Sequence, residues 1–120
     1  MTKRAVFNTA AKHLLTQNCK SKGDLGCMYR GNKGTSCAVG VLIPDELYDR
    51  SMEGGFSTLI KKIDHKYCGN KIAKDLVNLF NKHEPLLFRL QLIHDNILPE
   101  EWRTALDKLA KEEKIIRPEY

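Results

Sequence analysis

The chain has 120 residues, of which 42% are hydrophobic and 29% charged, and it carries a net charge of +5. This length suits a single globular domain spanning 1–120 and leaves too few residues for a second independent core. The composition excludes a disordered chain, and the apolar run at 38–43 is far shorter than the roughly 18 residues that a membrane-spanning helix needs.

The N-terminal segment predicts an amphipathic helix. Apolar residues at positions 6, 7, 10, 11, 14 and 15 follow the spacing of one helix face. Thr2 is a suitable N-cap, and Asn18 lies near the end of the helix. Polar residues interrupt what would otherwise be the apolar region of a secretory signal. We therefore expect a cytoplasmic protein with no membrane partner.

The next segment has the pattern of a β-hairpin. Two short extended runs, 27–30 and 35–38, flank the sequence Gly-Asn-Lys-Gly, whose residues tolerate positive φ. A hairpin of two strands is marginal in water, so this one must pack against helices. From Ser36 onward the pattern changes to a buried helix over 37–43, with Ser36 as N-cap and Pro44 as its end. Gly40 within this helix suggests a close backbone contact.

The remainder of the chain predicts helices. Apolar positions repeat with a helical period over 56–63, although 57–60 also fits a strand, and again over 72–83, 85–97 and 99–109. Trp102 belongs to the core stripe of the last helix, and a short tail with Ile115, Ile116 and Pro118 is expected to dock on the body. The fold class is therefore mainly α (α+β): a compact bundle of five to six helices with one short β-hairpin near residues 27–38.

The four cysteines are expected to be free thiols, because disulfides are rare in a reducing cytosol. Their separations of 8, 10 and 31 positions lack the tight clip of a zinc site, so no metal and no cofactor are expected. Cys19 and Cys68 are expected to be small buried side chains.

Cys37 and His94 are the candidate catalytic residues. At the first turn of a helix capped by Ser36, Cys37 would have its thiolate stabilised by main-chain N–H groups, and His94 could act as its base. Asp95 follows His94, but adjacent helical residues point about 100° apart, so Asp45 or Asp49 would orient the ring better. The alternative is structural: Cys37 as a buried thiol, and His94 as a histidine at the edge of the core.

A second group of residues could bind a partner. Arg30 could hold a phosphate or carboxylate in a bidentate fork, or form a salt bridge to Asp45 or Asp49. Tyr29 and Tyr48 could anchor an interface. The candidate binding residues are Arg30, Tyr29, Asp45, Tyr48 and Asp95.

Three stretches of sequence carry a resemblance. The first combines Cys-Met-Tyr-Arg-Gly from position 27, Cys-Ala-Val-Gly-Val-Leu-Ile-Pro-Asp-Glu-Leu-Tyr-Asp from position 37, and Met-Glu-Gly from position 52. The others are Phe-Asn-x-x-Ala-x-His-Leu-Leu from position 7 and Leu-Gln-x-x-His-Asp from position 90. In these features the chain resembles small uncharacterised proteins of tailed bacteriophages and prophages. The resemblance implies an accessory phage product acting inside a bacterial cell, and it implies no catalytic residues.

Three functions follow as expectations. The first is a non-catalytic accessory protein that binds and modulates a host or phage protein. The second is a small cysteine-dependent hydrolase or transferase that uses Cys37 and His94. The third is a nucleic-acid binder, because 1–74 carries a net charge of +7 against −2 for 75–120. The lysines are scattered, however, and no aromatic residues alternate with them as on an RNA-stacking surface.

Overall fold

The fold is that of a computed structural model, of which residues 1–116 are described. Five α-helices lie in this part of the chain: α1 (Lys3–Gln17), α2 (Phe56–Lys66), α3 (Lys71–Lys82), α4 (Glu84–Asn96) and α5 (Trp102–Glu112). Strands β1 (Lys22–Gly23) and β2 (Gly26–Cys27) form a short antiparallel ladder. The prediction of a mainly α fold with one short hairpin is confirmed. Among residues 1–116, no helix combines the length and apolar character needed to cross a bilayer.

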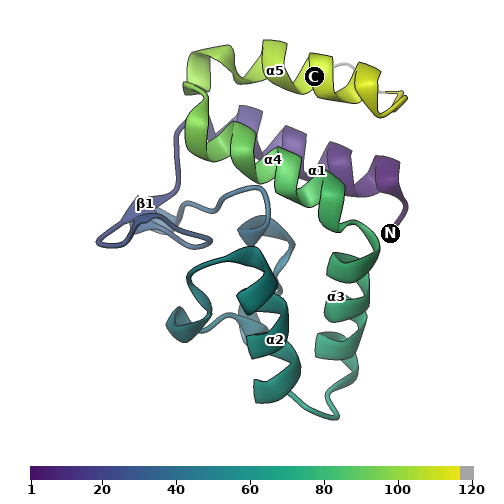
Figure 1. Cartoon of the computed structure of the whole chain (residues 1–120). Coiled ribbons are helices and arrows are strands. Elements are labelled where there is room, and N and C mark those ends of the chain that lie inside the picture. Colours follow the sequence, from purple (N-terminus) through teal and green to yellow (C-terminus); the bar gives the residue numbers. More distant parts are fainter. Residues whose placement is uncertain (117–120) are drawn as a thin grey trace.

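The helices form two groups that meet at α4. Helices α1, α4 and α5 pack on one another, and α2 packs on α3, which joins α4 at a sharp corner (Figure 1). The segment between α1 and α2 contains the β-ladder and a series of 3-10 turns, and it lies beside α4 (Figure 1). One continuous core unites these elements, with Phe7, Met52, Phe80, Leu90 and Trp102 among its largest buried side chains.

The local sequence signals explain the helix limits well. As predicted, Thr2 caps α1, its side chain accepting the N–H of Ala5, and the helix ends at Asn18, which adopts the left-handed conformation. Pro85 lies in the first turn of α4, where its missing N–H costs nothing. The strand alternative for 57–60 is wrong, because these residues lie within α2.

The hairpin differs in position from the prediction. The ladder lies at 22–27, and the segments predicted to pair, 27–30 and 35–38, are joined by a single bridge between Arg30 and Ser36. Two main-chain hydrogen bonds make this bridge, from Cys37 N–H to the carbonyl of Tyr29 at 3.2 Å and from Gly31 N–H to the carbonyl of Thr35 at 3.0 Å. The loop is therefore a chain reversal held by few main-chain bonds.

The predicted helix over 37–43 is wrong. Only Gly40–Leu42 forms a 3-10 turn, and Ile43 is extended. Ser36 does not cap it: the turn starts after Val39, and the N–H of Gly40 donates to Sγ of Cys37 at 3.2 Å. The expected close contact at Gly40 is confirmed: a Cβ there would lie 1.9 Å from the carbonyl oxygen of Tyr29.

Two smaller expectations concern the cysteines and the tail. Cys19 and Cys68 are exposed, so the prediction that they are buried is wrong. Ile115 packs against the core, whereas Ile116 is 76% exposed. Pro118 lies outside the described residues.

Candidate functional site

The carboxylate of Glu53 organises the loops in front of α4. Its Oε1 accepts the main-chain N–H of Tyr29 at 2.8 Å, and its Oε2 accepts the N–H of Arg30 at 3.2 Å and the hydroxyl of Tyr48 at 2.7 Å. The hydroxyl of Tyr29 donates to the carbonyl of Gly54 at 2.6 Å. Glu53 thus takes two N–H groups that a neighbouring strand would otherwise pair.

The side chain of Arg30 binds the loop at 40–45. Its Nη1 pairs with Oδ1 of Asp45 at 2.7 Å, Nη2 donates to the carbonyl of Ile43 at 2.5 Å, and Nε donates to the carbonyl of Gly40 at 3.2 Å. The guanidinium carbon lies 5.3 Å from the centre of the Tyr48 ring. The predicted salt bridge between Arg30 and Asp45 is confirmed. Because every nitrogen of the guanidinium binds this chain, the bidentate fork is already occupied.

Cys37 is enclosed rather than presented to a cleft. Its side chain is 0% exposed, and its Sγ accepts the N–H of Gly40 at 3.2 Å. Burial raises the pKa of the thiol to about 12, although hydrogen bonds from the main chain of Gly40 and Val39 act in the opposite sense. The thiolate activation expected from a helix N-terminus therefore does not arise, because no α-helix starts there.

His94 has both ring nitrogens engaged. Nε2 accepts the main-chain N–H of Ser21 at 2.9 Å, so the ring proton resides on Nδ1 and is donated to Oδ1 of Asp95 at 2.7 Å. The ring is 0% exposed and stacks on Trp102 with the ring centres 5.6 Å apart. The expectation that Asp95 is poorly placed to orient His94 is wrong. With its lone pair bound to Ser21, His94 has none available to accept a proton from Cys37.

Asp95 is the polar centre of a small pocket in front of α4. Its Oδ1 also accepts the side-chain amide of Gln91 at 2.9 Å, and the thiol of Cys27 faces the carboxylate. The pocket has a volume of about 190 Å³. Its lining residues are Cys27, Met28, Tyr29, Glu53, Gly54, Gly55, Phe56, Phe88, Gln91, Leu92 and Asp95. We call this cavity the Asp95 pocket.

Cys27, His94 and Asp95 are the set within residues 1–116 that comes nearest to a metal site. One possible ligand atom from each lies within 4.8 Å of the others. A metal on His94 would need a free ring lone pair, but Nε2 accepts the N–H of Ser21 and Nδ1 carries the proton shared with Asp95. Coordination through Nδ1 would move the ring proton to Nε2, where it would face the N–H of Ser21, so that two hydrogen-bond donors would point at each other. The trio therefore fits a hydrogen-bonded cluster better than a metal site.

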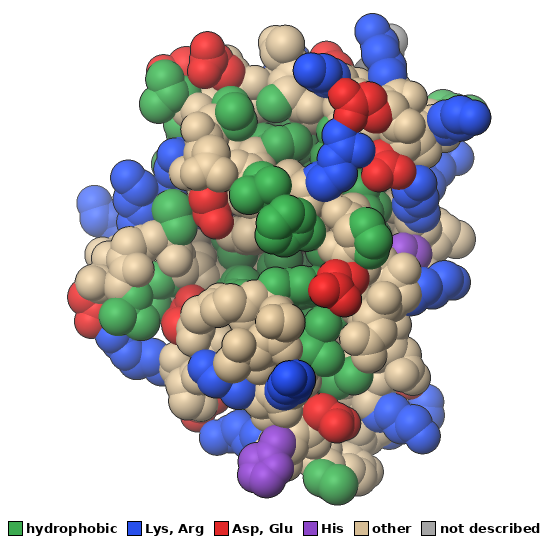
Figure 2. All heavy atoms as spheres, in the orientation of Figure 1, with side chains coloured by type: hydrophobic (Ala, Val, Ile, Leu, Met, Phe, Trp, Pro, Cys, Tyr) green, Lys and Arg blue, Asp and Glu red, His purple; other side chains and the backbone are tan. Residues whose placement is uncertain are grey.

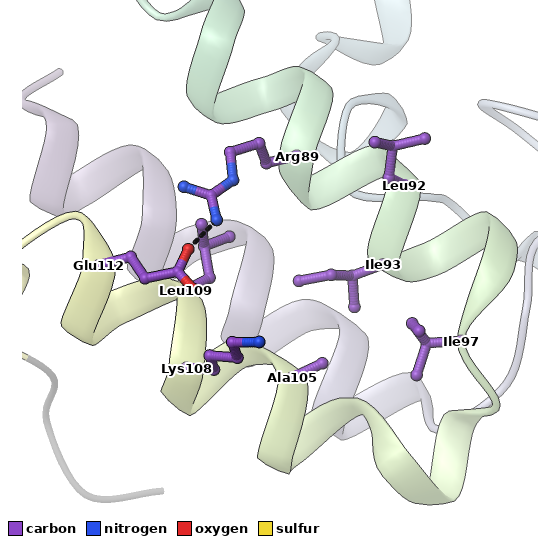
Figure 3. A pocket seen from close by; sticks show the side chains of 8 residues that line it. All are labelled: Arg89, Leu92, Ile93, Ile97, Ala105, Lys108, Leu109 and Glu112. Atoms are coloured by element: carbon purple, nitrogen blue, oxygen red, sulfur yellow. Dashed lines mark hydrogen bonds and ion pairs between the residues drawn. The ribbon is translucent and has the colours of Figure 1, made fainter.

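A second pocket, of about 220 Å³, lies between α4 and α5. Figure 3 shows Ile93 and Leu109 pointing into it, with Arg89 and Glu112 joined by an ion pair at one end. Leu92 lines both this pocket and the Asp95 pocket. Leu92 is 41% exposed, and Phe88, one turn before it on α4, is 55% exposed. We call these two side chains the α4 ridge.

The α4 ridge belongs to an apolar region of the surface. Figure 2 shows hydrophobic side chains gathered over α4 in the middle of this face, beside a hollow, with charged side chains around them. Isolated exposed apolar residues are normal, but two large ones a turn apart between two pockets form a surface that a partner could cover.

The structure brings the sequence-predicted residues into two groups. Arg30, Asp45 and Tyr48 form the loop fastening, while Tyr29 and Asp95 line the Asp95 pocket together with Cys27. Glu53, Gln91 and the α4 ridge were not predicted from the sequence. Phe88 carried a usable signal, because it falls outside the apolar stripe of its own helix. Glu53 carried none, since its role depends on contacts with residues 24 positions away.

No protein-family model matches the sequence, and no curated protein or solved structure is significantly similar to it. The function is therefore inferred from the geometry of this face and from the resemblance in sequence motifs.

Proposed function

We propose that the chain is a small phage-type accessory protein that binds a host or phage protein through the α4 ridge, without catalysing a reaction. The observation that carries this proposal is the exposure of Phe88 and Leu92, at 55% and 41%, between two small pockets. Large apolar and aromatic side chains at the centre of an interface supply most of its binding energy. Pockets beside such a ridge can receive side chains from the partner.

The chemistry around α4 supports binding over catalysis. A cysteine hydrolase needs an accessible thiolate with a base beside it. Cys37 is buried with its pKa raised to about 12, and His94 uses its lone pair to hold Ser21. The hydrolase expectation therefore gains no support from this site.

Photo-crosslinking in living bacteria tests the proposal. A photoreactive phenylalanine analogue would replace Phe88 in one variant and Ile72 in another. Ile72 is a suitable control because it is 48% exposed and lies on α3. We expect specific protein adducts from position 88 and none of the same adducts from position 72. Nuclease treatment before analysis separates protein partners from nucleic acid.

The purified partner then allows a quantitative comparison. Phe88→Ala combined with Leu92→Ala should weaken binding about tenfold or more, as loss of interface anchors does, while Ile72→Ala should change it less than about twofold. Equal affinity of the double variant and the unmodified chain would remove the α4 ridge from the interface. Identical adducts from positions 88 and 72 would have the same consequence.

A further inference from the structure

We propose that the Asp95 pocket receives a cationic side chain, lysine or arginine, from the protein partner, and that the carboxylate of Asp95 pairs with it. The inference rests on the proposed function in one respect, because that partner supplies the side chain. It goes beyond the proposed function by naming the chemistry that the pocket recognises.

The size of the pocket favours a single side chain. Sites for small molecules and cofactors usually enclose about 300–1,000 Å³. The Asp95 pocket has about 190 Å³ and opens beside the α4 ridge, since Phe88 and Leu92 line it. A cavity of this size next to exposed apolar anchors resembles the pockets that hold one interface side chain.

The charged residues of the lining are acids. Within residues 1–116, the lining contains two carboxylates, from Glu53 and Asp95, and no lysine or arginine. Glu53 is committed to Tyr29, Arg30 and Tyr48. Asp95 differs from Glu53 in that its two donors, His94 and Gln91, both bind Oδ1 and fix the orientation of the carboxylate. The imidazole donates as a neutral ring, so neither donor cancels the negative charge. The side chain of Asp95 stays 34% exposed.

Two lysines beside the site donate to main-chain oxygens and not to these carboxylates. Lys20 donates to the main-chain oxygen of Asp95 at 2.9 Å, and Lys62 donates to the main-chain oxygen of Glu53 at 3.1 Å. Neither ammonium is placed on a carboxylate by these bonds. A cation from a partner would therefore find the Asp95 carboxylate oriented and still charged.

Two titrating groups in the lining sense this negative charge. Burial and then the Asp95 carboxylate raise the pKa of the Cys27 thiol, although Lys20 and Lys22 act in the opposite direction. Burial, followed by electrostatic interactions with Cys37, Glu53 and Asp95, raises the pKa of the Tyr29 hydroxyl. Both groups are therefore held in the protonated, neutral form, and neither adds a competing charge to the pocket.

The apolar walls suit the remainder of such a side chain. Phe56, Phe88 and Leu92 line the cavity, and lysine and arginine bury their methylene stems against apolar groups while the charged end reaches a polar one. Aromatic faces also attract cations directly. Because the chain has a net charge of +5, it repels a partner with a large positive charge. The pocket therefore recognises a single cationic side chain and not a basic surface.

Small probes test this chemistry on the full chain without the partner. We would titrate n-butylguanidinium, n-butylammonium and the neutral n-pentanol into the isotope-labelled protein and follow its amide resonances. We expect the two cations to shift the amides of Cys27, Gln91 and Asp95 with millimolar affinity, and n-pentanol to bind more weakly. Added salt should weaken the cations and leave n-pentanol unchanged.

A matched pair of variants assigns the effect to Asp95. Asp95→Asn keeps an oxygen for His94 and Gln91 but removes the charge, whereas Asp64→Asn makes the same charge change at an exposed position on α2. The cations should bind about fivefold or more weakly to the first variant, as loss of a modest ion pair implies, and within about twofold of normal to the second.

Three results would overturn the inference: n-pentanol binding as well as the cations, Asp95→Asn binding them unchanged, or no cation shifting the pocket amides. None of these results depends on crosslinking at Phe88. A partner captured at Phe88 with no cation binding would refute this inference alone. Cation binding without any specific adduct at Phe88 would refute the proposed function alone.

Discussion

The main-chain N–H of Ser21 donates to Nε2 of His94 at 2.9 Å, across a separation of 73 residues. Both residues are 0% exposed. The bond attaches the chain just before the β-ladder to α4. It also places the ring proton on Nδ1, from which His94 donates to Asp95. One buried hydrogen bond thus connects the position of the ladder to the orientation of the pocket carboxylate.

Removing the His94 ring should destabilise the fold. His94→Ala leaves the buried N–H of Ser21 without its acceptor and opens a cavity against Trp102, with which the ring stacks. We expect the free energy of unfolding to fall by about 2–4 kcal/mol in urea titrations. His65→Ala, at an exposed position, should change it by less than about 0.5 kcal/mol. A loss below about 1 kcal/mol in His94→Ala would mean that this bond contributes little.

Gly40 should tolerate no side chain. A Cβ at this position would lie 1.9 Å from the carbonyl oxygen of Tyr29, which is main chain and accepts the N–H of Cys37. Gly40→Ala should therefore cost about 3 kcal/mol or more or prevent folding, as judged by thermal unfolding and amide spectra. Gly55→Ala is the control, because a Cβ there would meet only Thr58 Oγ1, at 3.9 Å. Similar melting temperatures for the two variants would refute the close approach of the two loops.

The four thiols should react in a defined order. Cys37 is buried and its pKa is raised to about 12, so iodoacetamide at neutral pH should modify it only when the protein unfolds. Cys19 and Cys68 are exposed and should be modified first. Cys27 is an exposed residue too, but partial desolvation of its thiol, and then the nearby Asp95 carboxylate, raise the pKa of that thiol. Its modification should therefore be slower than that of Cys19 and Cys68.

Mass spectrometry of peptides taken at successive times measures this order directly. Asp95→Asn should accelerate the modification of Cys27, because it removes the charge that disfavours the thiolate. Rapid modification of Cys37 in the folded chain would revive the interpretation of Cys37 as a nucleophile.

The helices could be predicted from the sequence because their determinants are local. The apolar stripe of α1, its Thr2 cap, and Pro85 at the start of α4 lie within a few residues of the structure they specify. The loop between α1 and α2 could not be predicted in the same way. There Glu53 takes the N–H groups of Tyr29 and Arg30, so the expected strand pairing is replaced by a side chain from far along the sequence.

The candidate site shows the same division. The segment 36–43 has the composition of a capped helix, but Gln17 on α1 binds the N–H of Ser36, and Sγ of Cys37 takes the N–H of Gly40. Cys37 thus performs the local capping role that the sequence assigned to Ser36. Asp95 was predicted to be a binding residue, and its hydrogen bond with His94 contradicts the simple geometry of adjacent helical residues.

Asp49 should make stability depend on pH in the acid range. Hydrogen bonds from Ser51, followed by the ammonium of Lys66, lower the pKa of this carboxyl from 3.8 to about 2. Between these values the folded chain keeps Asp49 ionised while the unfolded chain binds a proton. Its contribution to stability is therefore complete above about pH 4 and is lost as the pH falls towards 2.

Asp49→Asn isolates this contribution. The asparagine oxygen can still accept the N–H of Ser51, which Oδ1 of Asp49 accepts at 2.8 Å, but the ion pair with Lys66 is lost. We expect the urea midpoint of the unmodified chain to fall more steeply than that of the variant between about pH 4 and 2, so the two curves converge at the acid end. Glu113, whose pKa is also lowered, mainly by its bond with Lys3, is present in both chains and cancels in the comparison. Parallel curves over this range would show that Asp49 binds its proton equally in the folded and unfolded states.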